Sequence, residues 1–470
     1  MGGSPPRLTM GAERRNLAVL AEATRERRGD YPALWFEGRW HSSGELFARA
    51  ERVAAGLVAN GVRPGDRVVV PLPNSPDVLV AYHAIWRAGA VVTPAIFLLT
   101  ADELDRLVAD AQPALVLTSE LLATLELDAP QAIVARDESD LAALVYTGGT
   151  TGRAKGVMLT HANLYEAGRA GHAAGHVDGI ERALSCLPLA HSYGLLVLNV
   201  GLHHPGRPQT VLMRWFDPHE WLRLAQKHRV QIAPVVPSML YLLLAEALED
   251  YDLSALQFVA SGAAPLASAA RDDFVRRVPG VQIREGYGLT ETSALVSTNP
   301  PGRIKPGTVG PPVPGTEVRI VDGEVCVRSE LVMAGYWNAP GLTAATIRDE
   351  WLYTGDIGRL GDDGYLTIVD RKKDLIIRGG FNVFPRDIEE ALLEHPAVAS
   401  ACVVGRPDPV YGEEVVAFVT LAADTDCGEL VEFGRQRLGG YKYPREIRVL
   451  EALPLTPVGK ADRKVLRELL

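Results

Sequence analysis

The sequence predicts an α/β protein with a large N-terminal domain and a smaller α+β C-terminal domain. Its 470 residues exceed what one ordinary core accommodates. Strand-like apolar runs alternate with helical patterns through most of the chain, which indicates parallel sheets covered by helices. Residues 300–370 instead combine frequent Gly and Pro with short β-like runs, which is typical of a small β-barrel-like unit.

The individual elements follow from capping signals and apolar periodicity. The first predicted helix covers residues 41–62, where Ser42 and Glu45 have the spacing of a capping box. A second helix is predicted at 75–90 between two buried strands. The predicted strands lie at 66–74, 91–96, 113–119, 182–191, 209–216, 230–238, 317–322, 323–329 and 364–371.

A charged run and a new amphipathic helix mark the start of a second domain. The run DRKKD precedes a helix predicted at 385–395, and helix and strand patterns alternate again to the end. We therefore place the N-terminal domain at 1–371, a hinge at 372–373 and the C-terminal domain at 374–470. Ligands of such arrangements usually bind in the cleft between the domains.

Composition narrows the classes of function. The net charge of −10 argues against a nucleic-acid-binding protein, which needs a basic surface. The cysteines are far apart in the sequence and have no metal-type spacing, so we expect reduced thiols. They are Cys186, Cys326, Cys402 and Cys427. Neither a signal peptide nor an apolar run of the roughly 18 residues that suggest a membrane span is recognisable. These features favour a cytoplasmic protein without a membrane span.

The stretch VYTGGTTGRAKGVMLTH, residues 145–161, follows an apolar run and combines glycines, hydroxyls and one lysine. Such a loop can bind phosphate through backbone N–H groups, hydroxyls and a cation. It is not a Walker A loop, because Gly156 stands where that motif places Ser or Thr, and it lacks G-x-G-x-x-G. On its own, the loop is explained equally well as a turn or as a phosphate clamp.

Four further motifs decide between these alternatives. They are GYGLTE at 286–291, YTGD at 353–356, DRKKDLIIRGGFNVFP at 370–385 and PLTPVGKADR at 454–463. In this order, and with the loop, the chain resembles the adenylate-forming superfamily of acyl-CoA synthetases, luciferases and peptide-synthetase adenylation domains. It is most similar to a free-standing fatty- or aryl-acid CoA ligase. Departures at Gly148, Ala154 and Ala461 remove no catalytic group.

The resemblance implies an activation reaction at the ATP α-phosphate, followed by transfer of the acyl group to a thiol. It assigns the β- and γ-phosphates of ATP to Thr147, Gly149, Thr150, Thr151 and Lys155. Glu291 is the implied Mg²⁺ ligand, since a hard cation prefers carboxylate oxygen, and Thr290 is the implied donor to the α-phosphate. Adenine is assigned to Tyr287, Gly262 and Ala263, and the ribose to Asp356 and Arg371, with Gly288 as a further cofactor-binding position.

The resemblance also implies that the C-terminal domain is mobile. Lys460 is the implied adenylation lysine, and losing such a contact typically costs roughly 10²–10³ in rate. Rotation at Lys373 replaces Lys460 by Gly379 and Gly380, which then border the CoA pantetheine arm. His191, in PLAHSYG, matches a gate of the acyl pocket, although a lone histidine is more often structural.

The sequence identifies the carboxylic acid substrate only in part. The segments that match the acyl pocket are mostly apolar, and Arg214 is the only cation in them, which disfavours dicarboxylates. Candidate walls are Tyr193, Trp215, Val236 and Met239. We therefore expect a ligase that uses ATP, Mg²⁺ and CoA on a fatty or aromatic monocarboxylate.

Two rivals remain open at this stage. One is an adenylating enzyme that delivers the acyl group to a separate carrier protein, and the other is an inactive nucleotide-binding sensor. The expected partners are small molecules, with nucleic acid excluded and a homodimer left open.

Overall fold

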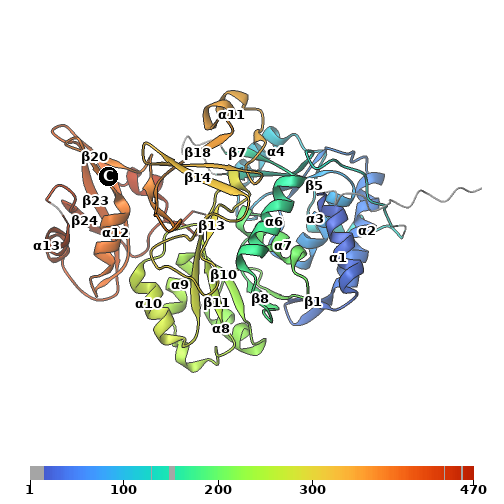
Figure 1. The fold of residues 1–470 in the computed structure, drawn as a ribbon, viewed down its shortest axis with the longest axis horizontal. Coiled ribbons are helices and arrows are strands. Elements are labelled where there is room, and N and C mark those ends of the chain that lie inside the picture. The colour runs from blue at the N-terminus through green and yellow to red at the C-terminus, as the bar shows by residue number, and fades with distance from the viewer. Residues whose placement is uncertain (1–14, 129, 148–153, 439, 457–458) are drawn as a thin grey trace, which may run out of the picture.

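The computed structural model describes residues 15–128, 130–147, 154–438, 440–456 and 459–470 (Figure 1). Within these residues the strands form four sheets, of which three belong to the N-terminal part and one to the C-terminal part. The predicted α/β class, with helix-covered sheets, a barrel-like unit and a separate α+β domain, is confirmed. In the described residues, the helices are all too short or too polar to cross a membrane.

The largest sheet has the strand order β13-β12-β11-β10-β8-β9-β1-β2. Strands β8 to β12 pair with one another in parallel, because helices connect them, whereas β13 pairs with β12 antiparallel. The strands are β1 (Pro32–Phe36), β2 (Arg39–Ser42), β8 (Arg182–Ser185), β9 (Gln209–Leu212), β10 (Ile232–Val235), β11 (Phe258–Ser261), β12 (Gln282–Tyr287) and β13 (Ser297–Thr298).

A second sheet has the order β16-β7-β6-β4-β3-β5. Its strand Arg67–Val70, next to the edge, is rich in β-branched residues, and Val68 and Val69 are fully buried between helices. The strands are β3 (Arg67–Val70), β4 (Val91–Pro94), β5 (Leu115–Val116), β6 (Leu141–Thr147), β7 (Lys155–Thr160) and β16 (Gly335–Tyr336).

Helices cover both sheets. Helix α6 packs along α7, and small residues allow the close approach, since a Cβ on Gly168 would overlap the Asn199 carbonyl. The helices are α1 (Leu17–Arg28), α2 (Ser43–Ala59), α3 (Pro76–Arg87), α4 (Ala101–Ala111), α5 (Ser119–Thr124), α6 (His161–Gly175), α7 (Ser192–His203), α8 (Pro218–Lys227), α9 (Pro237–Leu244) and α10 (Ser268–Arg277).

The third sheet is the barrel-like unit that the sequence predicted. Its order is β14-β15-β18-β17, and β19 pairs with β18. The elements are β14 (Thr316–Val321), β15 (Glu324–Ser329), β17 (Ile347–Arg348), β18 (Trp351–Leu360) and β19 (Leu366–Arg371), with α11 (Pro340–Thr346) beside them. Short 3₁₀ helices cover Leu248–Asp250 and Thr290–Thr292.

The C-terminal part has its own sheet and its own core. The predicted helix at 385–395 is α12, and its apolar face buries Ile388 and Leu392 against the sheet. The strands are β20 (Ile376–Arg378), β21 (Phe381–Val383), β22 (Val398–Asp408), β23 (Gly412–Leu421) and β24 (Glu446–Val449), and the helices are α12 (Pro385–Leu393), α13 (Cys427–Arg437) and α14 (Arg463–Glu468). In Figure 1 this part lies at one end of the molecule, joined to the rest through β19 and β20.

Some local predictions were wrong in detail. The strand predicted at 182–191 ends at Ser185, because the chain turns there toward α7. Only half of the predicted capping box forms: the Ser42 hydroxyl accepts from the Glu45 amide, while the Glu45 carboxylate pairs with Arg39. Helix α1 and the β1–β2 hairpin had no counterpart in the prediction.

Candidate active site

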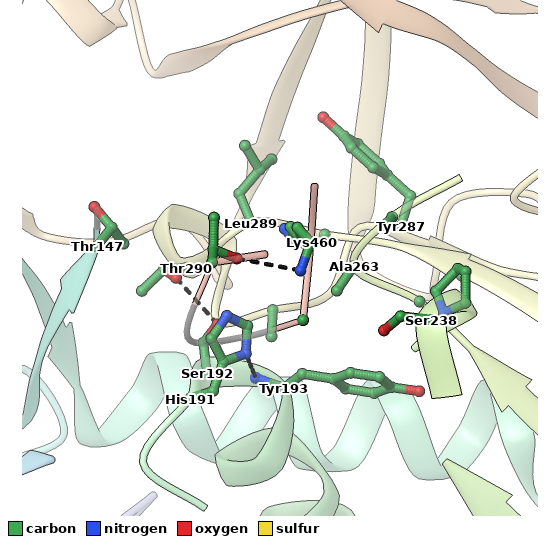
Figure 2. A pocket seen from close by; sticks show the side chains of 18 of the residues that line it. Thr147, His191, Ser192, Tyr193, Ser238, Ala263, Tyr287, Leu289, Thr290 and Lys460 are labelled. Atoms are coloured by element: carbon green, nitrogen blue, oxygen red, sulfur yellow. Dashed lines mark hydrogen bonds between the residues drawn. The ribbon is translucent and has the colours of Figure 1, made fainter. Parts of the chain in front are cut away.

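A cavity of about 2680 Å³ lies where the N-terminal sheets, the barrel-like unit and the C-terminal domain meet. Side chains from several of the sequence motifs line it. Figure 2 shows Thr147, Thr290, Tyr287, Ala263 and Lys460 around this space. Sequence motifs that lie hundreds of residues apart therefore form one site.

The hairpin β6–β7 carries the glycine- and threonine-rich loop. Thr147 and Lys155 are Cα partners at the end of the hairpin where this loop joins the strands, and both line the cavity. Gly149, Thr150 and Thr151 lie outside the described residues. The Lys155 Nζ stands 5.6 Å from the centre of the Tyr336 ring, so the lysine lies over an aromatic face.

Thr290 and Glu291 lie on the short 3₁₀ helix that follows β12. The Thr290 hydroxyl is 3.0 Å from the Ser192 hydroxyl. The Tyr336 hydroxyl donates to Glu291 Oε1 at 2.8 Å, and burial together with this carboxylate raises the tyrosine pKa. Among the described residues Glu291 Oε2 has no hydrogen-bond partner, so the carboxylate is held in position through its other oxygen, and its role as a metal ligand stays a prediction.

Tyr336 is a site residue that the sequence analysis missed. Strand β16 pairs with β7, so that Tyr336 lies beside Val157 on the strand that begins at Lys155. The pairing spans about 180 positions in sequence, and a two-residue strand has no periodicity to reveal it. The only available signal was an aromatic residue in a Gly-rich run, GYWN.

The ribose end of the predicted site is built by two neighbouring strands. Asp356 on β18 and Arg371 on β19 are Cα partners, and the Arg371 Nε is 3.0 Å from Asp356 Oδ1. The Tyr287 hydroxyl donates to Asp356 Oδ2 at 2.6 Å. Asp356 is only 2% exposed, and burial raises its pKa although Arg371 and Tyr287 favour the charged form.

Small residues form the wall assigned to adenine. Gly262 and Ala263 follow β11 and line the cavity, and Ala263 has φ 71°, an uncommon backbone conformation for alanine. A Cβ on Gly288 would overlap the Ala294 carbonyl, so this position has no room for any side chain. These small residues form a shallow wall beside the Tyr287 ring. Stacking of this ring on adenine stays a prediction.

Lys460 enters the cavity from the C-terminal domain. Its backbone is fixed to Thr456, because Thr456 N donates to the Lys460 carbonyl at 2.7 Å and Lys460 N donates to the Thr456 hydroxyl at 3.2 Å. The Gly459 backbone approaches Ser238 of α9 so closely that a Cβ would stand 3.0 Å from its hydroxyl. Burial, followed by Arg371, lowers the pKa of Lys460 to about 8.

His191 lines the cavity but also has a structural role. It is the N-cap of α7, and its Nδ1 accepts from the Tyr193 amide at 3.2 Å. Burial, and then the nearby Lys460, lower its pKa to about 4, so the ring is neutral near pH 7. The gating role stays a prediction.

Gly379 and Gly380 lie outside the cavity. They form the two-residue turn between β20 and β21, with φ 56° and 82°, and both are exposed. Positive φ at both central positions is what a type I′ hairpin turn requires, so glycine fits here for local reasons as well. Their role beside CoA stays a prediction.

Three of the four candidate acyl-pocket walls were wrong. Tyr193 lines the cavity, whereas the other three do not: Trp215 is 60% exposed, Met239 packs against a buried apolar core, and Val236 lies beside Gly459. Strand β9 ends at Leu212, and the residues after it turn to the surface. Arg214 pairs with Glu37 at 2.7 Å, so it points away from the cavity.

Comparison with known proteins identifies the family of this chain. A family model described as AMP-binding enzyme matches residues 21–337, and a second, described as AMP-binding enzyme C-terminal domain, matches residues 387–460. The chain belongs to the AMP-binding enzyme family. It is therefore an enzyme, and the class recognised from its motifs is confirmed.

Individual relatives of this AMP-binding enzyme are CoA ligases. It is 36% identical to the long-chain-fatty-acid–CoA ligase of Bacillus subtilis, over 93% of this chain and 92% of that one. It is also 36% identical to a feruloyl-CoA synthase of Amycolatopsis, over 88% of this chain and 91% of that one. The identity and coverage support an ATP-dependent acid–thiol ligase that forms an acyl adenylate.

Among solved structures, the ATP-bound MatB of Rhodopseudomonas palustris is 31% identical and superposes with a TM-score of 0.87, covering 97% of this AMP-binding enzyme and 99% of MatB. The apo form of the same MatB gives a TM-score of 0.77. The overall structure is therefore more similar to the ATP-bound form. This agrees with the insertion of Lys460 between the N-terminal sheets and the barrel-like unit.

Proposed function

We propose that this enzyme activates a fatty or aromatic monocarboxylic acid with ATP and Mg²⁺ and then transfers the acyl group to CoA. The observation that carries the proposal is the position of Lys460. It lines one cavity together with Asp356, Thr290 and Glu291, so a cation from the C-terminal domain reaches the nucleotide residues of the N-terminal domain.

In the first step, a carboxylate oxygen of the acid attacks the α-phosphorus of ATP. The bond from this phosphorus to the bridging oxygen breaks, and pyrophosphate leaves. Negative charge grows on the phosphate oxygens, and positioned donors stabilise it most when they are fixed in advance. Lys460 supplies the charge and Thr290 the hydroxyl, while Asp356 accepts from the ribose hydroxyls, since one carboxylate accepts two hydrogen bonds.

The residues present fit a Mg²⁺ ion that enters with the nucleotide. Mg²⁺ commonly takes one or two carboxylates and fills its other positions with phosphate oxygens and water. Glu291 provides one oxygen without a hydrogen bond from any residue that the structure describes, and Thr147 and Thr290 line the same cavity. When bound, the ion would neutralise charge on the departing pyrophosphate.

For the second step we propose domains at 1–371 and 374–470 that rotate about residues 372–373. The thiol of CoA attacks the acyl carbonyl, the bond to AMP breaks, and AMP leaves with the electron pair. Lys372 already has a partner in this pose, since its Nζ is 3.0 Å from Glu324 Oε2, and rotation would break that pair. The Gly379–Gly380 turn would then replace Lys460 at the cavity.

An acid panel tests the proposal. Pyrophosphate release is measured with ATP and Mg²⁺ over fatty acids, benzoic acids and phenylpropenoic acids, with and without CoA. We expect release with at least one acid and acyl-CoA when CoA is present. Pyrophosphate release without acyl-CoA would favour the carrier-protein rival, and silence with every acid would favour the inactive sensor.

A further inference from the structure

The cavity extends well past the reaction centre, along one face of α7. This face presents Tyr193, Leu196, Val197, Val200, Gly201 and His204 to the cavity. Their spacing of three to four residues keeps them on one side of the helix. Eleven residues at 1.5 Å each separate Tyr193 from His204, so the helix stripe is about 16 Å long.

The opposite wall of this extension is the face of the large sheet. Alternate residues of a strand point to the same side, and the side toward the cavity carries mainly small residues. They include Ala183 of β8, Thr210 of β9, Pro234 of β10, Ala260 of β11 and Gly286 of β12. Short side chains on the sheet leave room for a substrate between the sheet and α7.

Three histidines stand at the far end of the extension. His172 and His176 come from the last turns of α6, and His204 is the C-cap of α7. The His172 ring centre is 4.5 Å from that of His176 and 5.7 Å from that of His204. All three line the cavity, so a mainly apolar channel ends in imidazoles.

The three rings differ in their hydrogen bonds. His204 uses both nitrogens, since Nε2 is 3.1 Å from the Ile180 carbonyl and Nδ1 accepts from the Gly206 amide at 3.0 Å. His176 Nε2 is 3.0 Å from an oxygen of Asp178. The ring nitrogens of His172 have no hydrogen-bond partner among the described residues. His172 is therefore the ring with nitrogens available to a ligand.

The charges nearby favour an uncharged ligand group. Glu181 lines the same end of the cavity and Asp178 binds His176, so a second carboxylate would meet negative charge. Two cations near this end already bind backbone carbonyls, since Arg284 donates to the Gly175 carbonyl at 3.0 Å and Arg28 donates to the Gly201 carbonyl at 2.8 Å. Burial, with His176 and His204, lowers the pKa of His172 to about 4, so its ring is neutral near pH 7.

We infer that His172 is a specificity-determining residue and that the preferred acids carry a neutral hydrogen-bonding group, such as a hydroxyl, at the end remote from the carboxylate. This inference rests on the proposed function. A neutral imidazole offers one donor and one acceptor, which match a hydroxyl on both counts. A site built to bond a substrate hydroxyl rejects the analogue that lacks it far more strongly than an apolar pocket rejects an added group.

The test compares three matched series of straight-chain acids that end in a methyl, a hydroxyl or a second carboxylate. Lengths run from about eight to about sixteen carbons, because the channel stripe is about 16 Å long. The kcat/KM for pyrophosphate release is measured for each acid. At the best length, we expect the hydroxyl acid to exceed the methyl acid by at least about tenfold and the dicarboxylate by more.

Variants then assign the preference to His172. His172→Phe should reduce the ratio of hydroxyl to methyl acid to about one or below, and His172→Asn should keep part of it. His219→Phe, at a well-exposed histidine outside the cavity, should leave the ratio unchanged. Butanoic acid, too short to reach His172, should react equally with all variants and shows that they are folded.

The outcomes separate the two proposals. Silence of the wild type with every acid overturns the proposed function and, with it, this inference. If the wild type uses the methyl and hydroxyl acids with equal kcat/KM, or if the preference for the hydroxyl acid survives in His172→Phe, the role of His172 is overturned while the proposed function stands. If His172→Phe also fails with butanoic acid, the ratio in His172→Asn decides, and a wild-type ratio there overturns the role of the imidazole.

Discussion

Replacing Tyr336 by Phe removes one hydroxyl and keeps the ring beneath Lys155. The hydroxyl donates to Glu291 Oε1 at 2.8 Å, so the variant loses one hydrogen bond to a charged group. Such a bond contributes about 1.5–3 kcal/mol. Because 1.36 kcal/mol corresponds to a factor of ten, losing this bond corresponds to roughly a 10- to 100-fold change in an equilibrium constant. Since Glu291 is the proposed metal ligand, we expect the affinity for Mg²⁺ to fall by this factor.

The assay is acid-dependent pyrophosphate release at saturating ATP, titrated with Mg²⁺. We expect the half-saturating Mg²⁺ concentration of Tyr336→Phe to rise roughly 10- to 100-fold, and the rate to recover at high Mg²⁺. Tyr365→Phe is the matched control, because its hydroxyl donates to the Arg303 carbonyl at 2.6 Å outside the cavity. An unchanged Mg²⁺ requirement in Tyr336→Phe would refute the positioning of Glu291.

Further predictions concern Lys460, Gly288 and Asp356. The kcat/KM for adenylation should fall as pH rises through about 8, because Lys460 then loses its proton. In Lys460→Arg this fall should move to higher pH. The same descending limb in the wild type and in Lys460→Arg would exclude Lys460 as the titrating group. Gly288→Ala should lower the free energy of unfolding by about 1–3 kcal/mol, since its methyl meets the Ala294 carbonyl. Gly341→Ala is the control and should leave the free energy of unfolding unchanged, because a Cβ there meets no described atom within 4 Å. Equal urea midpoints for the Gly288→Ala and Gly341→Ala variants would contradict the close packing of Gly288. Asp356→Asn should raise the KM for ATP at least about tenfold, because an amide oxygen replaces the charged acceptor of two hydroxyls; an unchanged KM would remove Asp356 from the ribose site.

Motif residues were predictable because the chemistry constrains them directly. Asp356, Glu291 and Lys460 stand in short ordered motifs, and the structure brings all three to one cavity. The pairing of Asp356 with Arg371 follows from two neighbouring strands, so even this contact was within reach of the sequence. The fold class followed equally well, since helix and strand periods alternate along most of the chain.

Residues placed by long-range packing were not predictable in the same way. Tyr336 reaches Glu291 only because β16 pairs with β7, and His172 meets His204 only because α6 packs along α7. Trp215 shows the converse error, since an apolar run does not reveal where a strand leaves its sheet. In each case the deciding contact joins segments far apart in sequence, and local patterns carry no information about it.

The role of Lys460 in a two-pose enzyme is tested most directly by measuring the half-reactions separately in Lys460→Ala. Adenylation is followed as pyrophosphate release from ATP and acid, and thioester formation as acyl-CoA produced from supplied acyl-AMP and CoA. We expect adenylation to fall by roughly 10²–10³ while thioester formation stays within about twofold of wild type. Equal loss of both half-reactions would contradict a lysine that serves only the first pose.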